Sequence, residues 1–490
     1  MIKDWKGLKV VIVGAARQGV ALARYLAGHG ARVVLTDLRS KDDLAGEIAS
    51  LQELPAVKTP VEWVLGEHPL GLLDGANLLC LSGGAPPTIQ LAVEAQKRGI
   101  PLSNDSQIFL ENVPCKVIGI TGSAGKSTTT SLVGSIAQQA FTGEAQNGSR
   151  RRKAWVGGNI GSPLISWVDE MQADDLAVME LSSFQLELMD RSPQVAAILN
   201  ITPNHLDRHG SMEVYTEIKA RIIAHQAFGD IAVLGRDDPI SWSLAQKVHS
   251  KLMSFGITEP SGGDEGTFLK DDNLYLRIQE IQDDMFVMSR SEIRVPGAHN
   301  LQNVLAACAI AAAAGLPVAA MRAGISSFEG MPHRLEYVRR WGGADWYNDS
   351  IATAPERTMA AIKSFNRPII LLAGGRDKGL PWDELAEMIY QRVDHLIVFG
   401  EARDIILKAL VETGSVKGIS ATIGNNEDSI LIGEPTITVC MTLKEAVSET
   451  AKLVEPGDVV LLSPGGTSFD EFFDFEERGA CFVQLVRDLT

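Results

Sequence analysis

Cysteine is scarce in this chain of 490 residues. The five cysteines are scattered, with no C-x-x-C pair and no cluster of cysteine with histidine; they are Cys80, Cys115, Cys308, Cys440 and Cys481. This spacing argues against a disulfide framework and against a zinc site, and it favours reduced thiols in a cytosolic protein.

Positive charge is also in short supply. The chain has 45 basic and 61 acidic residues, a net charge of −16, and a pI of about 5.1. This balance argues against a general nucleic-acid binder. Glycine-rich loops and a few cations can still bind small anions, so the acidic composition does not exclude an anionic small-molecule substrate.

Long apolar runs are nearly absent. The longest, Val304 to Met321, is mostly alanine and is broken by Gly315 and Pro317, so we expect a buried helix and not a membrane span. Trp5 and Lys6 lead directly into a predicted strand, so we expect no signal peptide and a cytoplasmic location. We also expect a monomer with no nucleic-acid or membrane partner.

What is present points to several α/β domains. Hydrophobic residues make up 45% of the chain, and the length suggests about three domains. Apolar strands alternate with helical segments, which predicts mainly parallel sheets. We predict a Rossmann-like domain over 1–112, a central P-loop mononucleotide-binding domain over 113–330, and a second Rossmann-like domain over 331–490.

The most informative motif is VIGITGSAGKSTTT at residues 117–130. A buried strand, a glycine-rich turn and a helix opening with Lys-Ser are the layout of a phosphate-binding loop. Backbone N–H groups and the helix N-terminus would face the anion, Lys126 would reach the β- and γ-phosphates, and the Ser127 hydroxyl would ligate Mg²⁺. Ile120 stands where the usual pattern has its first glycine, so an ordinary strand-to-helix turn is the alternative. The predicted ATP-binding residues are Gly122, Ser123, Ala124, Gly125, Lys126, Ser127 and Thr128.

A second glycine turn, residues 14–19, follows a predicted strand over 8–13. A strand over 31–36 and Asp37 come next, which is close to a dinucleotide fingerprint, but Ala16 replaces its second glycine. The pattern therefore leaves three readings: a structural Rossmann-like domain, an NAD-dependent dehydrogenase, or a domain that holds the nucleotide part of a substrate.

Polar residues follow several strands of the central segment. Asn159 lies in a GGNIG turn, Glu180 ends a strand, and His205 belongs to TPNHLDRHG at 202–210. A carboxylate at a strand end after a P-loop suits a metal ligand. Lys219 lies beside the apolar stripe of a helix, where a lysine usually extends its ammonium to solvent. The cations Arg150–Lys153 read as a solvated loop tip, and 255–295 reads as hairpins at the edge of a sheet.

Together these motifs resemble the Mur ligases, ATP-dependent amide-forming enzymes of peptidoglycan assembly. The matching segments are GITGSAGKSTTT, GGNIG, ELSSFQLE, NITPNHLDRHGS, PGAHNLQN, HR at 333–334 and LLSPGGTSFDEF. They span nearly the whole chain in the family's order. Several also occur in folylpolyglutamate synthetases, so they indicate the chemistry better than the substrate.

Three segments point to the family member that adds D-glutamate: ELSSFQLE, NDSIATAPE and SPGGTSFDEFFDFEERG. The resemblance implies that ATP phosphorylates the carboxylate of UDP-N-acetylmuramoyl-L-alanine and that the amine of D-glutamate attacks the acyl phosphate. The alternatives are a related ligase adding L-glutamate, to a muramoyl or a folate substrate, and a nucleotide-binding protein without ligase activity.

The resemblance also assigns roles to single residues. Lys126, His205 and Lys219 are expected to be catalytic, with Lys219 carbamylated, and Ser127, Glu180, His205 and Lys219 are expected to bind two Mg²⁺ ions. Asn303, Arg334 and Asp349 join the ATP site. The expected substrate residues are Gln18, Thr36, Asp37 and Ser82 for the UDP group, Asn159 and His205 for the muramoyl part, and Thr353, Lys378, Ser468 and Phe475 for D-glutamate.

Two positions depart from the family's pattern. Asn204 stands before His205 where aspartate is frequent, and NDSIATA carries Ile351 where many members have lysine. The nucleotide contact expected from that lysine is therefore absent from this chain.

Overall fold

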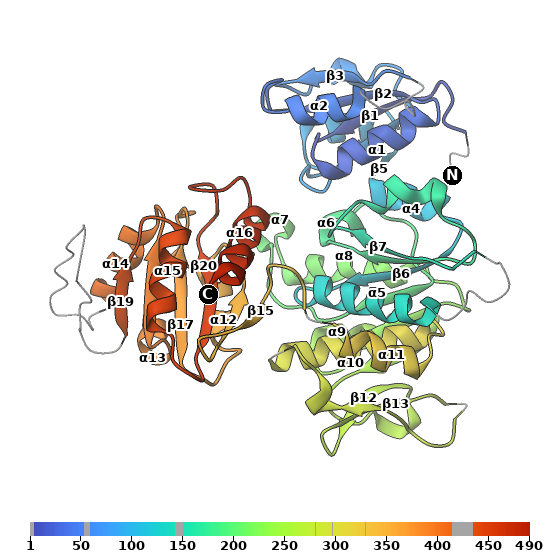
Figure 1. Ribbon diagram of the computed structural model, residues 1–490. Helices are drawn as coiled ribbons and strands as arrows, with labels where there is room; N and C mark the ends of the chain where they lie inside the picture. Colours follow the sequence, from blue (N-terminus) through green and yellow to red (C-terminus); the bar gives the residue numbers. More distant parts are fainter. Residues whose placement is uncertain are drawn as a thin grey trace. The chain divides into compact units, whose positions relative to one another are not determined.

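The computed structural model describes residues 4–52, 59–142, 150–279, 281–295, 297–328, 330–413 and 435–490. The chain divides into two compact units: unit 1 is Met1–Ile293 with His299–Phe328, and unit 2 is Arg294–Ala298 with Glu329–Thr490. The described residues form three separate sheets, two in unit 1 and one in unit 2 (Figure 1). The predicted α/β class with three sheets is confirmed. The first two predicted domains fall within one unit, so their boundary at 112 stays a prediction.

The first sheet of unit 1 is parallel throughout, in the order β3-β2-β1-β4-β5. Its strands are β1 (Lys9–Val13), β2 (Arg32–Asp37), β3 (Glu62–Leu65), β4 (Leu78–Leu81) and β5 (Leu102–Ser103), and its helices are α1 (Arg17–Gly28), α2 (Ala45–Gln52), α3 (Gln90–Lys97) and α4 (Asp105–Asn112). The chain builds outward from β1 to β3 and then returns to the other side of β1 with β4. The strand order therefore reverses between β1 and β4, where open α/β sheets bind ligands.

The second sheet of unit 1 has nine strands in the order β14-β13-β12-β11-β10-β9-β6-β8-β7. They are β6 (Lys116–Thr121), β7 (Ala154–Gly158), β8 (Leu176–Glu180), β9 (Val195–Ile198), β10 (Ile231–Gly235), β11 (Lys251–Phe255), β12 (Gly266–Lys270), β13 (Asn273–Arg277) and β14 (Met285–Ser289). Among the described strands, the pairs β12–β13 and β13–β14 are antiparallel, which confirms the predicted hairpins at the sheet edge, whereas β11 and β12 pair parallel. β6 lies between β8 and β9, so this sheet also reverses its order beside the glycine-rich turn.

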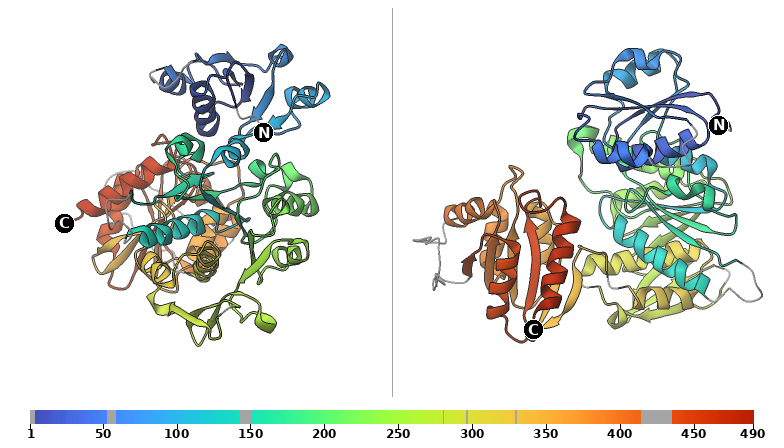
Figure 2. Two further views of the ribbon diagram at one scale, coloured as in Figure 1. Left: turned by 90° about the vertical axis from the view of Figure 1, so that its right-hand side faces the viewer. Right: turned by 45° about the horizontal axis from the view of Figure 1, so that its top comes forward.

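The helix after that turn, α5 (Lys126–Thr142), is anchored by close packing. Helix α11 (Val318–Ser326) runs beside it (Figures 1 and 2). A β-carbon at Gly324 of α11 would stand 2.7 Å from the Cα of Ile136, so only glycine allows this approach. The remaining helices of the unit are α6 (Ser183–Leu186), α7 (Leu206–His209), α8 (Met212–Ala224), α9 (Pro239–Ser243) and α10 (Ala298–Ala313).

The alanine-rich run forms α10 and the start of α11, separated at Gly315 and Pro317 as predicted. Most residues of α10 are buried. Among the described residues, no helix combines the length and the apolar character needed to cross a membrane.

The sheet of unit 2 has the order β15-β16-β20-β17-β18-β19 and is parallel except for β15. Its strands are β15 (Glu336–Trp341), β16 (Ala344–Asn348), β17 (Ile369–Gly374), β18 (His395–Phe399), β19 (Thr436–Val439) and β20 (Val459–Gly465), and its helices are α12 (Pro355–Ile362), α13 (Asp383–Arg392), α14 (Arg403–Glu412), α15 (Leu443–Leu453) and α16 (Phe475–Asp488). Leu371 of β17 packs into one core layer, and its neighbours Ile370 and Leu372 pack into the other. Because both faces are covered, these strands read in the sequence as continuous apolar runs.

The basic segment 150–153 is more tightly held than a solvated tip. The guanidinium of Arg150 pairs with Asp175 at 2.6 Å and with Asp174 at 3.1 Å, and the Lys153 amide donates to Asp175 at 2.8 Å. These contacts fix the entry into β7. Residues 143–149 of the same predicted loop lie outside the described part of the chain.

Candidate active site

Lys126, at the start of α5, folds back over the glycine-rich loop between β6 and α5. Nζ of Lys126 donates to the carbonyl oxygens of Gly122 at 2.9 Å and Ser123 at 3.2 Å. Gly125 has φ +81°, and a β-carbon there would stand 2.3 Å from Oδ1 of Asn303. Glycine is therefore required at 125, and the structure brings Asn303 of α10 directly against the loop.

Lys219 of α8 is buried beside the same loop, with 1% of its surface exposed. Its Nζ donates to the Gly122 carbonyl at 3.0 Å and to Oγ1 of Thr121 at 3.3 Å. Burial, and secondarily the charge of Lys126, lower the pKa of Lys219 to about 6, although Glu180 acts in the opposite direction. The expectation that this ammonium extends to solvent is wrong, because α8 turns it into the interior. At neutral pH the group is largely an uncharged amine.

Glu180 and Asn159 meet at the ends of β8 and β7. Nδ2 of Asn159 donates to Oε1 of Glu180 at 2.8 Å. Oε2 of Glu180 is buried and has no hydrogen-bond partner among the described residues. A buried carboxylate oxygen without a donor suits a cation ligand.

The donor set for a metal near Glu180 is small. The described residues contain no group of three or more His, Cys, Asp and Glu side chains that could hold a metal ion. The oxygen donors available to a divalent cation here are Oε2 of Glu180 and the Ser127 hydroxyl at the start of α5. A small number of protein oxygens suits Mg²⁺, which keeps several waters.

The loop that carries His205 is organised by Phe184, which sequence reasoning did not single out. His205 has φ +53°, and its ring lies 5.1 Å from that of Phe184. His209 stacks on the same ring at 5.5 Å and its Nε2 lies 3.0 Å from Oγ of Ser183. The Arg208 guanidinium covers the Phe184 ring at 3.9 Å. The segment ELSSFQLE was the available signal, since it supplies both Glu180 and this aromatic anchor.

In the first sheet, the predicted residues lie at the carboxyl ends of β1, β2 and β4. Oε1 of Gln18 accepts from the Gly83 amide at 3.3 Å, next to Ser82. Oγ1 of Thr36 donates to the Glu67 carbonyl at 3.0 Å and lies 2.9 Å from Nδ1 of His68. His68 was not predicted, although it follows a strand in the same way.

Asp37 is held by its own chain. It accepts from the Ala15 amide at 2.7 Å and from the Arg39 guanidinium at 2.9 and 3.0 Å. The hydrogen bond from Arg39 is the main cause that keeps the pKa of Asp37 well below its usual range. Asp37 thus stays ionised and closes the turn after β1, and Arg39 is a second residue that the sequence did not reveal.

In unit 2, Asp349 is buried at the end of β16. Its oxygens accept from the Leu335 amide at 3.2 Å and from Oγ of Ser463 at 2.9 Å. Burial raises the pKa of Asp349 to about 7, and the hydrogen bonds and Arg334 counteract that rise. His333 and Leu335, which flank Arg334, have φ of +63° and +44°. Non-glycine residues in this region are strained, and such strain concentrates at functional loops.

The residues predicted for the amino acid also gather in unit 2. Nζ of Lys378 donates to Oγ1 of Thr353 at 3.1 Å. Phe475 begins α16 and its carbonyl accepts from Oγ of Ser350 at 2.8 Å. Ser468 is buried in the loop that follows β20.

Arg478 joins these loops and was missed from the sequence. Its guanidinium is fully buried and donates to Oγ of Ser350 at 2.9 Å, to the Ser350 carbonyl at 2.8 Å and to the Gly466 carbonyl at 3.2 Å. Burial lowers the pKa of Arg478 to about 10. One cation on α16 therefore fixes the loops after β16 and β20.

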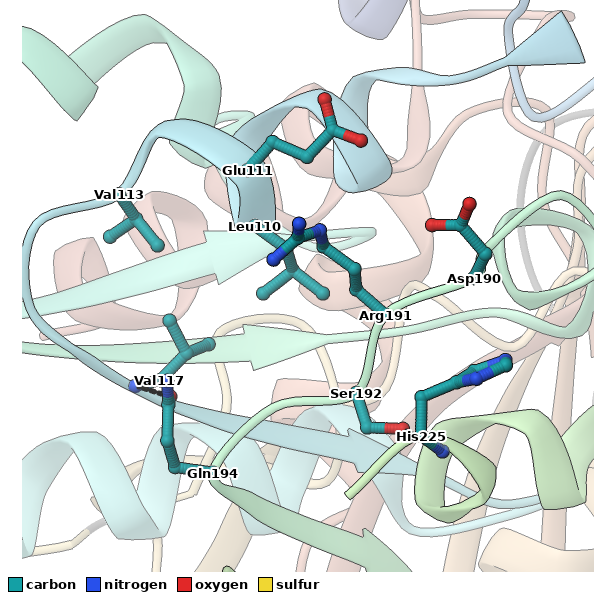
Figure 3. A pocket seen from close by; sticks show the side chains of 9 residues that line it. All are labelled: Leu110, Glu111, Val113, Val117, Asp190, Arg191, Ser192, Gln194 and His225. Carbon is teal, nitrogen blue, oxygen red and sulfur yellow. Dashed lines mark hydrogen bonds between the residues drawn. The ribbon is translucent and has the colours of Figure 1, made fainter. Parts of the chain in front are cut away.

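A cavity of about 410 Å³ lies elsewhere in unit 1, and Arg191 and His225 are among its lining residues (Figure 3). Val117, at the start of β6, donates its amide to Oε1 of Gln194 at 2.9 Å in its wall. The glycine-rich turn follows the other end of β6. None of the predicted site residues lines this cavity, so it is separate from the candidate site.

Comparison with known proteins gives two family matches. The Mur ligase middle domain matches residues 120–311, and the glutamate ligase domain of Mur ligases matches residues 333–466. The UDP-N-acetylmuramoylalanine–D-glutamate ligase of Symbiobacterium thermophilum is 37% identical over 482 residues, covering 98% of each chain. That of Pelotomaculum thermopropionicum is 36% identical and covers 100% of this chain and 99% of its own.

Solved structures agree in fold at low sequence identity. The UDP-N-acetylmuramate–alanine ligase of Thermotoga maritima has a TM-score of 0.57 at 16% identity, covering 98% of this chain and 99% of its own. MurF of Acinetobacter baumannii has a TM-score of 0.55 at 18% identity, covering 97% and 94%.

Proposed function

This chain belongs to the Mur ligase family, and we propose that it joins D-glutamate to UDP-N-acetylmuramoyl-L-alanine at the expense of ATP. The observation that carries the proposal is the full-length likeness, at 36–37% identity, to relatives named for that reaction. Such a ligase acts in the synthesis of peptidoglycan precursors in the cytoplasm. We propose that it works as a monomer.

The reaction proceeds in two displacements. The substrate carboxylate attacks the γ-phosphorus of ATP, the bond to ADP breaks, and an acyl phosphate forms. The amine of D-glutamate then attacks the acyl carbon, loses a proton, and expels inorganic phosphate from the tetrahedral intermediate. Both steps build negative charge on phosphoryl oxygens, and Lys126 with the amides of residues 122–128 can stabilise that charge.

We assign the metal ligands from the donor groups at the ends of β6 and β8. Glu180, through its unpaired Oε2, and the Ser127 hydroxyl would hold one Mg²⁺, and His205 would serve a second. When bound, Mg²⁺ neutralises phosphate charge and orients the reacting oxygens.

Lys219 is proposed to carry a carbamate. Its largely uncharged amine would attack carbon dioxide, form a C–N bond and release a proton, which leaves an anionic oxygen ligand. The carbamate would place a negative charge near the ammonium of Lys126, where the unmodified amine is largely uncharged at neutral pH. The burial of Lys219 and its lowered pKa support the assignment.

The remaining residues are assigned to parts of the substrates according to the sheet at whose strand ends they lie. Gln18, Thr36, Asp37 and Ser82 are assigned to the UDP group, and Asn159 with His205 to the muramoyl part. Asn303, which contacts the glycine-rich loop, is assigned to adenine. In unit 2, Arg334 and Asp349 are assigned to the nucleotide, and Thr353, Lys378, Ser468 and Phe475 to D-glutamate.

The test is phosphate release from ATP with Mg²⁺ and UDP-N-acetylmuramoyl-L-alanine, in the presence of D-glutamate, L-glutamate or neither. The proposal requires release that depends on both the UDP sugar and D-glutamate. Release with L-glutamate alone would keep the ligase chemistry and overturn the amino-acid assignment. Absence of release with either amino acid would leave a nucleotide-binding protein.

A further inference from the structure

Arg208 connects loops that belong to the two sheets of unit 1. It lies in α7, in the same loop region as His205. Its Nη1 donates to the carbonyl oxygen of Gly83 at 3.5 Å, and its Nη2 donates to the carbonyl oxygen of Ala85 at 3.5 Å. Both carbonyl groups belong to the loop that follows β4 of the first sheet. A side chain from the second sheet therefore holds that loop on either side of Gly84.

The guanidinium of Arg208 is fixed on its other sides by the segment that follows β8. It lies 3.9 Å from the centroid of the Phe184 ring, and its Nη2 lies 3.6 Å from Oε2 of Glu187. Glu187 balances the charge of Arg208, so we do not assign an anionic ligand to the guanidinium itself. Its contacts instead hold the loop after β4 at a fixed distance from the segment that begins at Glu180.

The contact with Gly83 also sets the direction of one peptide group. The carbonyl of Gly83 and the N–H of Gly84 belong to the same planar trans peptide, so they point in opposite directions. Because the carbonyl faces Arg208, the amide of Gly84 points away from it. No described residue accepts a backbone hydrogen bond from this amide, and a β-carbon at Gly84 would meet no atom within 4 Å. Open space and an available donor thus lie together at this residue.

The loop lies where the first sheet is expected to bind its ligand, because β4 is next to β1 at the reversal of the strand order. On the side of β1, the amide of Gly83 donates to Oε1 of Gln18 at 3.3 Å. A β-carbon at Gly14 would stand 2.1 Å from Oγ of Ser82, so close packing holds the loop against the turn after β1. Arg208 is the corresponding anchor from the second sheet.

We propose that Arg208 is a positioning residue for the UDP sugar. It holds the loop after β4 so that the amide of Gly84 donates to the diphosphate of UDP-N-acetylmuramoyl-L-alanine, and a backbone N–H bound to an ionised oxygen makes a strong hydrogen bond. Arg208 acts through the peptide between residues 83 and 84 and does not touch the substrate. The inference rests on the proposed ligase function and adds a residue that this function did not assign.

The experiment compares Arg208→Ala and Arg208→Lys with Arg98→Ala in the full-length protein. Arg98 is an exposed arginine at the end of α3 that pairs with Asp74 and Glu94 at 2.8 Å, so it controls for the loss of arginine contacts elsewhere in the same unit. Calorimetric titration gives the Kd for UDP-N-acetylmuramoyl-L-alanine without turnover. Phosphate release gives the KM values for ATP and D-glutamate, and thermal unfolding gives the melting temperature.

We expect Arg208→Ala to raise the Kd for the UDP sugar about fivefold, since one well-oriented hydrogen bond is weakened. The KM values for ATP and D-glutamate should stay within about twofold of the wild type, and Arg98→Ala should leave the Kd unchanged. Lysine presents a single ammonium, which cannot reach two carbonyl groups and cover a ring in the same way, so Arg208→Lys should recover only part of the affinity.

A second background tests the route through the peptide. Gly84→Pro removes the amide N–H, so adding Arg208→Ala to Gly84→Pro should raise the Kd less than about twofold. Equal effects of Arg208→Ala in both backgrounds would overturn the inference, and so would a Kd equal to that of Arg98→Ala. A lower melting temperature with an unchanged Kd would show a structural role only. A wild-type protein that binds the UDP sugar but forms no amide would refute the proposed function alone, and one that does not bind it would refute both.

Discussion

Replacing Lys219 by methionine isolates the effect of one buried ammonium. Methionine is similar in length and carries no charge, so packing changes little. The pKa of Lys219 is lowered from its usual 10.5 to about 6, mainly by burial. Between these values the unfolded lysine holds a proton that the folded amine does not. The stability of the wild-type protein therefore rises with pH across this window, and the lysine destabilises the fold most at or below about pH 6.

The magnitude follows from the same values. At pH 7 the lysine must lose a proton when the protein folds, and this lowers the stability of the folded state by up to about 5 kcal/mol. The value follows because each pH unit below 10.5 contributes about 1.4 kcal/mol. Methionine loses the hydrogen bonds to Gly122 and Thr121, which together contribute about 2 kcal/mol. Lys219→Met should therefore be more stable than the wild type by about 3 kcal/mol at pH 7. Near pH 10 the cost of losing the lysine proton falls below about 1 kcal/mol, which is less than the contribution of the lost hydrogen bonds. At that pH Lys219→Met should therefore be less stable than the wild type.

The assay is urea unfolding at pH 7 and pH 10, in buffers free of carbon dioxide and divalent metal. Lys247→Met, at an exposed position, serves as the matched control and should differ little from the wild type at either pH. Equal destabilisation of Lys219→Met at both pH values would refute the reasoning, because the ammonium would then not be penalised in the fold.

In the activity assay, Lys219→Ala should lose phosphate release and regain part of it with formate or acetate, which supply a carboxylate.

Three further outcomes are expected. Lys126→Met should fold normally by circular dichroism but lose at least about 100-fold in amino-acid-dependent phosphate release; activity near that of the wild type would contradict the phosphate role. Asp349→Asn should stabilise the protein by about 4 kcal/mol at pH 8 and by less than about 2 kcal/mol at pH 5 in urea unfolding, because burial raises the folded pKa to about 7 from 3.8 and the cost of ionisation grows between these values. Equal stabilisation by Asp349→Asn at both pH values would contradict the raised pKa of Asp349. Arg478→Met should lower the free energy of unfolding by about 3 kcal/mol, because the three lost hydrogen bonds from a charged donor, worth about 6 kcal/mol together, outweigh the relief of about 3 kcal/mol from removing a buried charge whose pKa is lowered to about 10. Arg487→Met should change it by less than about 0.5 kcal/mol.

The environment of Lys219 could not be predicted from the sequence pattern around it. Helical periodicity places residue 219 beside the apolar stripe of α8 but says nothing about the depth of the neighbouring loop. The structure shows that the carbonyl of Gly122 and the hydroxyl of Thr121 lie within reach, so the amine is satisfied in the interior. Only the family resemblance singles out this lysine, because a lysine beside an apolar stripe usually extends its ammonium to solvent.

The arginines missed from the sequence share one cause. Arg39 pairs with Asp37 two residues away, yet an arginine after a strand has no pattern that separates it from a surface charge. Arg478 contacts Ser350 across 128 residues of sequence. No local pattern marks a buried arginine, because its partners are carbonyl and hydroxyl groups brought together by strand order.

By itself the sequence determined the local elements and the chemistry at their ends. An apolar run, a glycine turn and Lys-Ser specify β6, its loop and the start of α5, since short-range sterics and hydrogen bonding decide such a turn. The tertiary structure alone decided which ends meet. Asn303 lies against Gly125, and its Oδ1 is 3.4 Å from Thr129, 174 residues away in the chain. Those encounters depend on strand order and on the close packing of α11 on α5, which arise from burial summed over the whole unit and leave no local trace in the sequence.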